Sequence, residues 1–217
     1  MKDTREYILY RGGSGEITEK KSRFIANIEK VETVEEAEAF IEQIKKKYWD
    51  ARHNCYAFSV GNNMPKSRCS DDGEPSGTAG KPMLEILTAH NLHNIVVVVT
   101  RYFGGTLLGT GGLVRAYQEA TKEGLRNCVV LERLRGSFLK VQIEYTELGK
   151  FQYTLAEEEI PVMGMEYTEK VSISIIVPEE KEDKIKEKII EITKNTAKIQ
   201  EERKVIFGLD KGEVILL

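Results

Sequence analysis

Residues 94–112 read NIVVVVTRYFGGTLLGTGG and place an unbroken apolar run directly before a segment with five glycines. The run at 95–99 consists of β-branched residues, which is typical of a strand that is covered on both faces. Glycine lacks a Cβ atom, so it is used where the backbone adopts a positive φ or is approached closely. The stretch therefore predicts a central buried strand followed by a turn at which something comes close to the main chain.

A short helix is predicted at 83–92, before this strand, and two longer helices are predicted around it. One is expected to begin at Gly112, with one apolar stripe formed by Leu113, Tyr117, Ala120 and Gly124. The other follows Thr33, which has the spacing of a capping box with Glu36. Its apolar positions, which are expected to lie on a core, are Ala37, Phe40, Ile41, Ile44 and Tyr48. Residues 23–31 and 54–60 alternate as strands do, and residues 63–82 are expected to form a long loop.

The pattern restarts near residue 135 and predicts a second domain. Strands are expected at 137–145, 160–167, 170–177 and 199–209, with helices near 146–159 and 179–196. The order strand, helix, strand, strand, helix, strand is that of a ferredoxin-like fold. We therefore predict an α+β protein with two domains, 1–134 and 135–217.

Composition and charge exclude several classes of protein. The 217 residues carry a net charge of -3; residues 1–134 hold 19 Lys and Arg against 18 Asp and Glu, and residues 135–217 hold 13 against 17. Neither half has the excess of positive charge that is typical of a basic nucleic-acid-binding domain, so phosphate binding would depend on local geometry. Neither a bilayer-spanning run nor a signal peptide is recognisable, and the three cysteines suggest no disulfide framework. A cytoplasmic protein without a membrane partner is expected.

The glycine segment has two interpretations. Amides at a helix start attract anions, and Arg101 and Arg115 stand where they could flank a phosphate. The alternative is a tight strand-to-helix turn with close packing. The segment does not match the known nucleotide-binding motifs. Val114 stands where the dinucleotide-binding pattern requires its last glycine. In a P-loop alignment of residues 75–82, Pro75 replaces the first glycine and Pro82 replaces the magnesium-binding Ser or Thr. Ordinary ATPase or GTPase chemistry is therefore not expected.

The acidic loop before residue 82 also has several interpretations. Asp71 and Asp72 could hold a magnesium ion, could close an Asx turn, or could contact a partner directly. The turn is favoured on general grounds, and no metal or cofactor is expected.

Other candidate groups are a His53 and Cys55 pair on one strand and a His90 and His93 pair. Neither has the partners that a nucleophilic or zinc site needs. Tyr102 and Phe103 are more suggestive: they could form a stacking site for a base or for a partner's side chain, or a buried pair that caps the strand.

Four blocks of sequence occur together: KKSRFIA at 20–26, ARHNCYAF at 51–58, DDGEPSGTAGKP at 71–82 and RYFGGTLLGTGGLVRAY at 101–117. As a set, they resemble the signature of the IMPACT family in its bacterial, YigZ-like form. The resemblance covers about residues 15–125, and the tail is similar to the extra ferredoxin-like domain of bacterial members.

The resemblance implies that the first domain is similar to the second domain of a ribosomal small-subunit protein and to the fourth domain of the translocating elongation factor. The tail looks like the fifth domain of that factor. It also implies a stress-response role in translation, since eukaryotic members compete for the activator of a kinase that senses amino-acid starvation.

We therefore expect a non-catalytic binding protein that regulates translation and binds RNA, the ribosome or an acidic group of a translation-related protein. The alternatives are a protein-interaction module that binds a translation factor or kinase activator, and an enzyme that acts on a phosphorylated small molecule through Asp71, Asp72 and Lys81. The candidate binding residues are Asp71, Asp72, Glu74, Ser76, Thr78, Lys81, Arg101, Tyr102, Phe103, Gly104, Gly105, Gly109, Gly111, Gly112 and Arg115.

Overall fold

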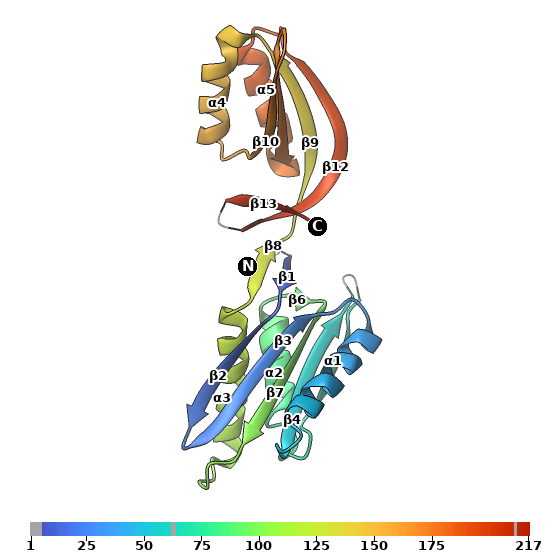
Figure 1. Ribbon diagram of the computed structural model, residues 1–217, viewed down its shortest axis with the longest axis vertical. Helices are drawn as coiled ribbons and strands as arrows, with labels where there is room; N and C mark the ends of the chain where they lie inside the picture. The colour runs from blue at the N-terminus through green and yellow to red at the C-terminus, as the bar shows by residue number, and fades with distance from the viewer. Residues whose placement is uncertain (1–5, 62–63, 211) are drawn as a thin grey trace. The chain divides into compact units, whose positions relative to one another are not determined.

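The structure is a computed structural model that describes residues 6–61, 64–210 and 212–217 (Figure 1). The chain divides into two compact units, Met1–Glu132 and Arg133–Leu217. Both units combine helices and strands, so the predicted two-domain α+β class is confirmed. In the described part of the chain, none of the helices has the length and apolar character that crossing a bilayer requires.

The first unit is built on a five-stranded antiparallel sheet with the order β2-β3-β7-β4-β5. The strands are β2 (Gly13–Glu19), β3 (Ser22–Lys30), β4 (His53–Val60), β5 (Lys66–Ser70) and β7 (Ile95–Tyr102). Strand β7 is the middle strand, and its residues alternate between two cores. Ile95, Val97 and Val99 pack on one side, and Val96 and Val98 pack on the other. The predicted central strand with two covered faces is confirmed.

Helices cover both faces of this sheet. Helix α1 (Val34–Lys47) lies on one face, and α2 (Gly80–Ala89) and α3 (Gly109–Arg126) lie on the other (Figure 1). The Thr33 hydroxyl caps α1 by accepting the Glu36 amide at 3.1 Å. The Glu36 carboxylate accepts the amide of Glu32 rather than that of Thr33, so only one half of the predicted capping box forms.

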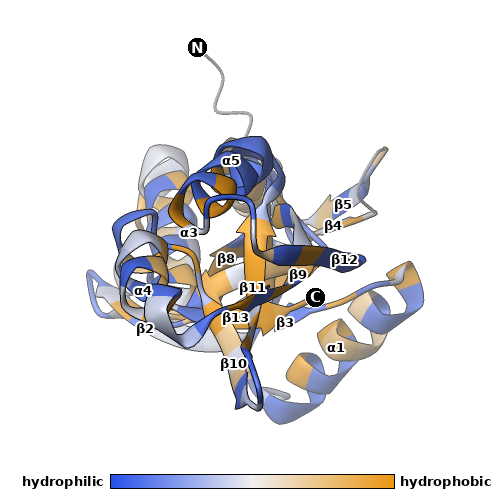
Figure 2. Cartoon of the chain, turned by 90° about the horizontal axis from the view of Figure 1, so that it is seen from above, coloured by the Kyte–Doolittle hydropathy of each residue, from blue (hydrophilic) through white to orange (hydrophobic). Residues whose placement is uncertain are grey.

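The helices are amphipathic as predicted, with hydrophobic and hydrophilic residues on different sides of α1 and α5 (Figure 2). All four predicted stripe positions of α3 are buried: Leu113, Tyr117, Ala120 and Gly124. Helix α3 nevertheless begins at Gly109 rather than at Gly112. Its first turn, Gly-Thr-Gly-Gly, has no apolar residue that would reveal a helical period in the sequence.

Two features of the first unit differ from the expectation. Residues 63–82 are not one long loop, because β5 pairs along the edge of β4 and α2 already starts at Gly80. A second, three-stranded sheet has the order β6-β1-β8, with β1 (Tyr7–Arg11) parallel to β6 (Leu92–His93) and antiparallel to β8 (Val129–Glu132).

The second unit has the predicted ferredoxin-like topology. Its antiparallel sheet has the order β10-β11-β9-β12-β13, and the first four of these strands reproduce that fold. The elements are β9 (Leu134–Ile143), η1 (Tyr145–Glu147), α4 (Leu148–Glu157), β10 (Val162–Tyr167), β11 (Val171–Pro178), η2 (Glu179–Lys181), α5 (Glu182–Ile192), β12 (Lys198–Asp210) and β13 (Glu213–Leu216). The hairpin to β13 adds a strand that the sequence pattern did not predict.

Candidate functional site

The first of two glycine-rich helix starts, that of α2, is closed by a side chain of the same loop. The Asp71 carboxylate accepts hydrogen bonds from the amides of Gly77, Ala79 and Gly80 at 2.8–2.9 Å. Burial raises the pKa of Asp71, but the three amide bonds outweigh it and hold that pKa below its ordinary value. The anion-attracting amides of α2 therefore already have an anion.

The rest of this loop is fixed by further contacts. Asp72 accepts the Asn54 amide at 2.7 Å and adopts a φ of 42°, and the Thr78 hydroxyl donates to the Pro75 carbonyl at 2.7 Å. The turn interpretation therefore describes both aspartates. Ser76 is exposed on this loop. Within residues 6–61, 64–210 and 212–217, no three His, Cys, Asp or Glu side chains are grouped in a way that could hold a metal ion.

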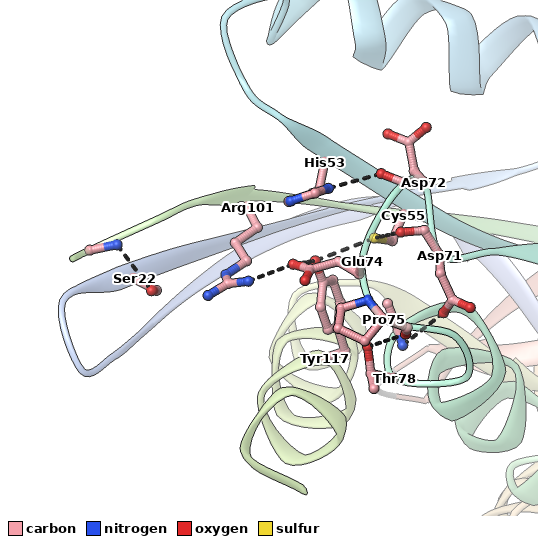
Figure 3. A network of polar contacts seen from close by, with 12 residues as sticks. Ser22, His53, Cys55, Asp71, Asp72, Glu74, Pro75, Thr78, Arg101 and Tyr117 are labelled. Atoms are coloured by element: carbon pink, nitrogen blue, oxygen red, sulfur yellow. Dashed lines mark hydrogen bonds and ion pairs between the residues drawn. The ribbon is translucent and has the colours of Figure 1, made fainter. Parts of the chain in front are cut away.

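Arg101 is not presented to solvent, contrary to our expectation. Its Nη1 donates to Glu74 Oε1 at 2.7 Å, and the two side chains are only 7% and 3% exposed. Tyr117 Oη donates to the same Glu74 oxygen at 2.9 Å (Figure 3). The guanidinium also lies 5.4 Å from the centre of the Phe24 ring and 5.6 Å from that of Phe103. Arg101 therefore ties the loop of Glu74 to the end of β7, and its positive charge is already neutralised.

The His53 and Cys55 pair belongs to the same buried network. His53 Nδ1 lies 2.9 Å from the Asp72 carbonyl, and Cys55 Sγ lies 2.9 Å from the Asp71 carbonyl and 3.3 Å from Tyr117 Oη. Burial raises the pKa of the Cys55 thiol far above its ordinary value. A neutral, buried thiol without a base beside it is a poor nucleophile, so the geometry assigns both side chains to packing.

The second glycine-rich helix start, that of α3, is open. The residue before the helix, Leu108, provides no capping side chain. The amides of Gly109, Thr110 and Gly111 form no hydrogen bond with any described part of the chain. A Cβ atom added to Gly105 or Gly109, which have φ values of +86° and +69°, would meet no atom within 4 Å, and one added to Gly111 would meet only the Arg115 guanidinium, at 4.0 Å. Gly109, Thr110 and Gly111 are exposed, and their amides have no internal partner among the described residues.

Gly104 has a different role from its neighbours. A Cβ atom on Gly104 would lie 2.0 Å from the carbonyl carbon of Lys21, and the Gly104 amide donates to the Ser22 hydroxyl at 3.1 Å. There is little space for a side chain at Gly112 either, because a Cβ atom there would lie 3.1 Å from the Cβ of Leu108. Close packing explains these two glycines, whereas open space surrounds Gly105, Gly109 and, apart from Arg115, Gly111. Each of the two interpretations of the segment thus fits some of its glycines.

A hollow of about 450 Å³ lies beside the open helix start, between the β2–β3 turn and α3. Three basic side chains line it, namely Lys20, Arg115 and Lys122, together with the acids Glu19 and Glu119. Arg115 is exposed and forms no ion pair with the residues that the structure describes. Lys81 is absent from this lining and lies at the start of α2, near Cys69 on the opposite edge strand. The predicted site residues therefore do not form one cluster.

Aromatic residues surround the end of β7. Tyr102 is held in place by a 2.7 Å hydrogen bond from its hydroxyl to Asp50 and by Arg23, which lies 5.8 Å from the ring centre. Phe103 is 53% exposed. Sequence reasoning missed Trp49, which directly precedes Asp50 and is 82% exposed. The signal was the position of the only tryptophan in the chain, immediately after the helix end KKKY.

Comparison with known proteins gives consistent matches in both units. The Impact N-terminal domain model matches residues 20–125, and a domain of unknown function, DUF1949, matches residues 141–196. The IMPACT family member YvyE of Bacillus subtilis (strain 168) is 41% identical over 90% of each chain, and YigZ of Escherichia coli (strain K12) is 35% identical over 83% of this chain and 89% of its own. A crystal structure described as that of a hypothetical protein is 32% identical, with a TM-score of 0.57 over 92% of this chain and 98% of the other.

Proposed function

Because this chain belongs to the IMPACT family, we propose that it is a non-catalytic binding protein with a regulatory role linked to translation. Relatives in animals are named Protein IMPACT, such as that of Mus musculus, which is 34% identical over 43% of this chain. The family resemblance is what supports the link to translation. The residues add a place for contact: an RNA phosphate docks on the open start of α3.

One observation carries this proposal, namely that the first amides of α3 have no internal partner. Free amides at a helix start and the helix dipole together attract anions. Arg115 and Lys20 line the adjacent hollow and supply positive charge at the same place. A polyanion gains several such contacts at once and displaces the counterions that it carried.

The contacts of the acidic loop favour binding over catalysis. An enzyme acting on a phosphorylated small molecule through Asp71, Asp72 and Lys81 needs carboxylates that are free to bind a metal or a proton. Asp71 instead accepts three amides and Asp72 accepts one. Both carboxylates are engaged in holding the loop, so they support its architecture.

The test is the salt dependence of RNA binding by the full chain. Fluorescence anisotropy of a labelled oligouridylate is followed from low to moderate salt for the wild type and for Arg115→Gln. Each phosphate contact on a single strand contributes about 0.7 to the slope of log K against log salt, so the slope should fall by about 0.7.

The matched control is Arg126→Gln at the other end of the same helix. Arg126 is paired with Glu119 and Glu123, so its loss should leave the slope unchanged. An unaltered slope and affinity in Arg115→Gln would rule out the start of α3 as the phosphate site.

A second candidate is an acidic group on a protein, such as a translation factor or a kinase activator. The observation that favours it is Leu107, which is 82% exposed on the segment leading into α3. Partner recovery in a pull-down that survives nuclease treatment and is lost in Leu107→Asp supports this candidate. Recovery that disappears with nuclease contradicts it.

A further inference from the structure

Aromatic residues occur at one end of the first unit's sheet, where β7 ends and β3 and β4 begin. The Tyr102–Asp50 hydrogen bond holds Asp50 at the end of β7, and Trp49 is the residue directly before Asp50. Phe103 directly follows Tyr102 in the sequence. Its ring lies next to Arg101, which bonds to Glu74 on the face of the sheet that α2 and α3 cover. Trp49 and Phe103 are 82% and 53% exposed, so both rings have faces in contact with solvent.

Unpaired cations lie at the same end. The backbone of Gly104 packs on that of Lys21, which brings the turn at Lys20 and Lys21 next to Phe103. His53 pairs with Arg101 in the sheet, and Arg52 directly precedes His53 at the start of β4. Lys20, Lys21 and Arg52 are exposed and form no ion pair with residues 6–61, 64–210 or 212–217. We call Lys20, Lys21, Trp49, Arg52, Tyr102 and Phe103 the strand-end surface.

We propose that the strand-end surface binds single-stranded nucleic acid by stacking bases on Trp49 and Phe103, with phosphates held by Lys20, Lys21 and Arg52. This inference rests on the proposed RNA-binding function and adds the way in which bases are recognised. Aromatic platforms flanked by unpaired cations suit a strand whose bases are unpaired, because every base has a face to stack and every linkage carries a charge. A duplex hides those faces within its own stack.

Charge favours nucleic acid over an apolar protein surface. The rings do not form a continuous apolar patch, since Arg23 lies over Tyr102 and Asp50 bonds to its hydroxyl. A protein partner with an apolar interface would leave Lys20, Lys21 and Arg52 without counter-charges. A phosphate backbone supplies those counter-charges at regular intervals.

Trp49 is the only tryptophan in the chain, so its fluorescence reports on this surface directly. The full chain is titrated with oligouridylate, and with inorganic polyphosphate of equal charge as a probe that lacks bases. We expect oligouridylate to quench the fluorescence and polyphosphate to bind without that quenching. Trp49→Ala and Phe103→Ala should each weaken oligouridylate binding roughly 5- to 100-fold and leave polyphosphate binding unchanged.

Controls separate stacking from charge and from folding. Tyr153→Ala removes a ring that is 70% exposed, on α4 of the second unit, and should leave oligouridylate affinity unchanged. The double variant Lys20→Gln with Lys21→Gln should lower the salt slope by about 1.4.

The outcomes distinguish this inference from the function on which it rests. Wild-type affinity in Trp49→Ala and Phe103→Ala, with weaker binding in Arg115→Gln, overturns stacking and leaves the start of α3 as the RNA site. Tighter binding to an RNA hairpin duplex than to oligouridylate also overturns stacking. Loss of affinity in both ring variants, with no loss in Arg115→Gln, supports the strand-end surface as the RNA site and rules out the start of α3 as that site. Absence of binding to either probe at low salt overturns both proposals.

Discussion

The two glycine-rich helix starts of the first unit have similar sequences and opposite states. The segment before α2 contains GTAG, and the first turn of α3 is GTGG. Asp71 closes the first by accepting three of its amides, whereas the first amides of α3 have no internal partner. Glycine content therefore does not say whether a helix start is available to a ligand. An acidic side chain within reach decides it.

The sequence itself carries this difference. Asp71, Asp72 and Glu74 precede α2 within nine residues, whereas no acidic residue occurs between Arg101 and Glu119. The two segments should also differ in their contribution to stability. The loop before α2 is bound to β4, β7 and α3 through Asp72, Glu74 and their partners.

The largest expected effect comes from breaking the buried pair on the closed side. Glu74→Gln keeps the shape of the side chain but leaves the Arg101 charge buried without a counter-charge. Loss of one partner of a buried ion pair costs about 3–5 kcal/mol. Urea unfolding at neutral pH measures the change, and Glu85→Gln on the exposed face of α2 is the control. A loss below about 1 kcal/mol would show that the pair does not hold this loop.

Removing the carboxylate charge that closes the start of α2 should lower the free energy of unfolding by a smaller amount. Asp71→Asn replaces a charged acceptor of three amides by a neutral one, so we expect a loss of about 1.5–3 kcal/mol in the free energy of unfolding. The folded-state pKa of Asp71 is lowered, so its contribution is complete above the ordinary value of 3.8 and is lost as the pH falls through the lower, folded-state pKa. Wild type and variant should therefore converge in stability in that acidic range. A constant difference down to low pH would contradict the role given to this carboxylate.

Two glycines of the open segment should respond in opposite directions. Gly104→Ala places a Cβ against the Lys21 backbone, and such overpacking costs about 1–3 kcal/mol. Gly111→Ala has room and removes a glycine from a helix, so it should stabilise the chain by about 0.5–1 kcal/mol. Thermal unfolding of both variants checks this. Equal effects of the two substitutions would mean that the segment is not divided into a packed part and an open part.

The smallest expected change in stability comes from adding an acidic side chain to the open start of α3. Gly111→Asp gives the start of α3 the carboxylate that α2 already has. The charge in the first turn should stabilise the helix by about 0.3–1 kcal/mol and, at the same time, weaken oligouridylate binding by repelling phosphate. Gly111→Ala is the matched control for the added side chain. Undiminished RNA binding by Gly111→Asp would count against the open start as the docking place.

Local patterns predicted much of the fold. The apolar run of β7, the stripes of α1 and α3 and the ferredoxin-like order of the second unit are periodic over many residues, and all are confirmed. The small sheet and β13 were missed because β6 has two residues and β13 has four, too few for a period to show. Such strands form through pairing with distant segments, which local sequence does not reveal.

The candidate site was harder to predict than the fold. Arg101 was expected to face a ligand, because nothing in the sequence shows that Glu74, 27 residues earlier, reaches it. Trp49 was overlooked because it stands outside every motif, and only its exposure and the Tyr102–Asp50 contact give it a place. Contacts between loops depend on how the sheet brings their ends together.

Amide chemical shifts of the glycines, followed by NMR while oligouridylate is added, observe both helix starts in one sample. If phosphate docks on the start of α3, the amide signals of Gly109 and Gly111 shift progressively, and those of Gly77 and Gly80, which already bind Asp71, stay in place. Shifts at Gly77 and Gly80 with none at Gly109 and Gly111 would contradict docking on the start of α3.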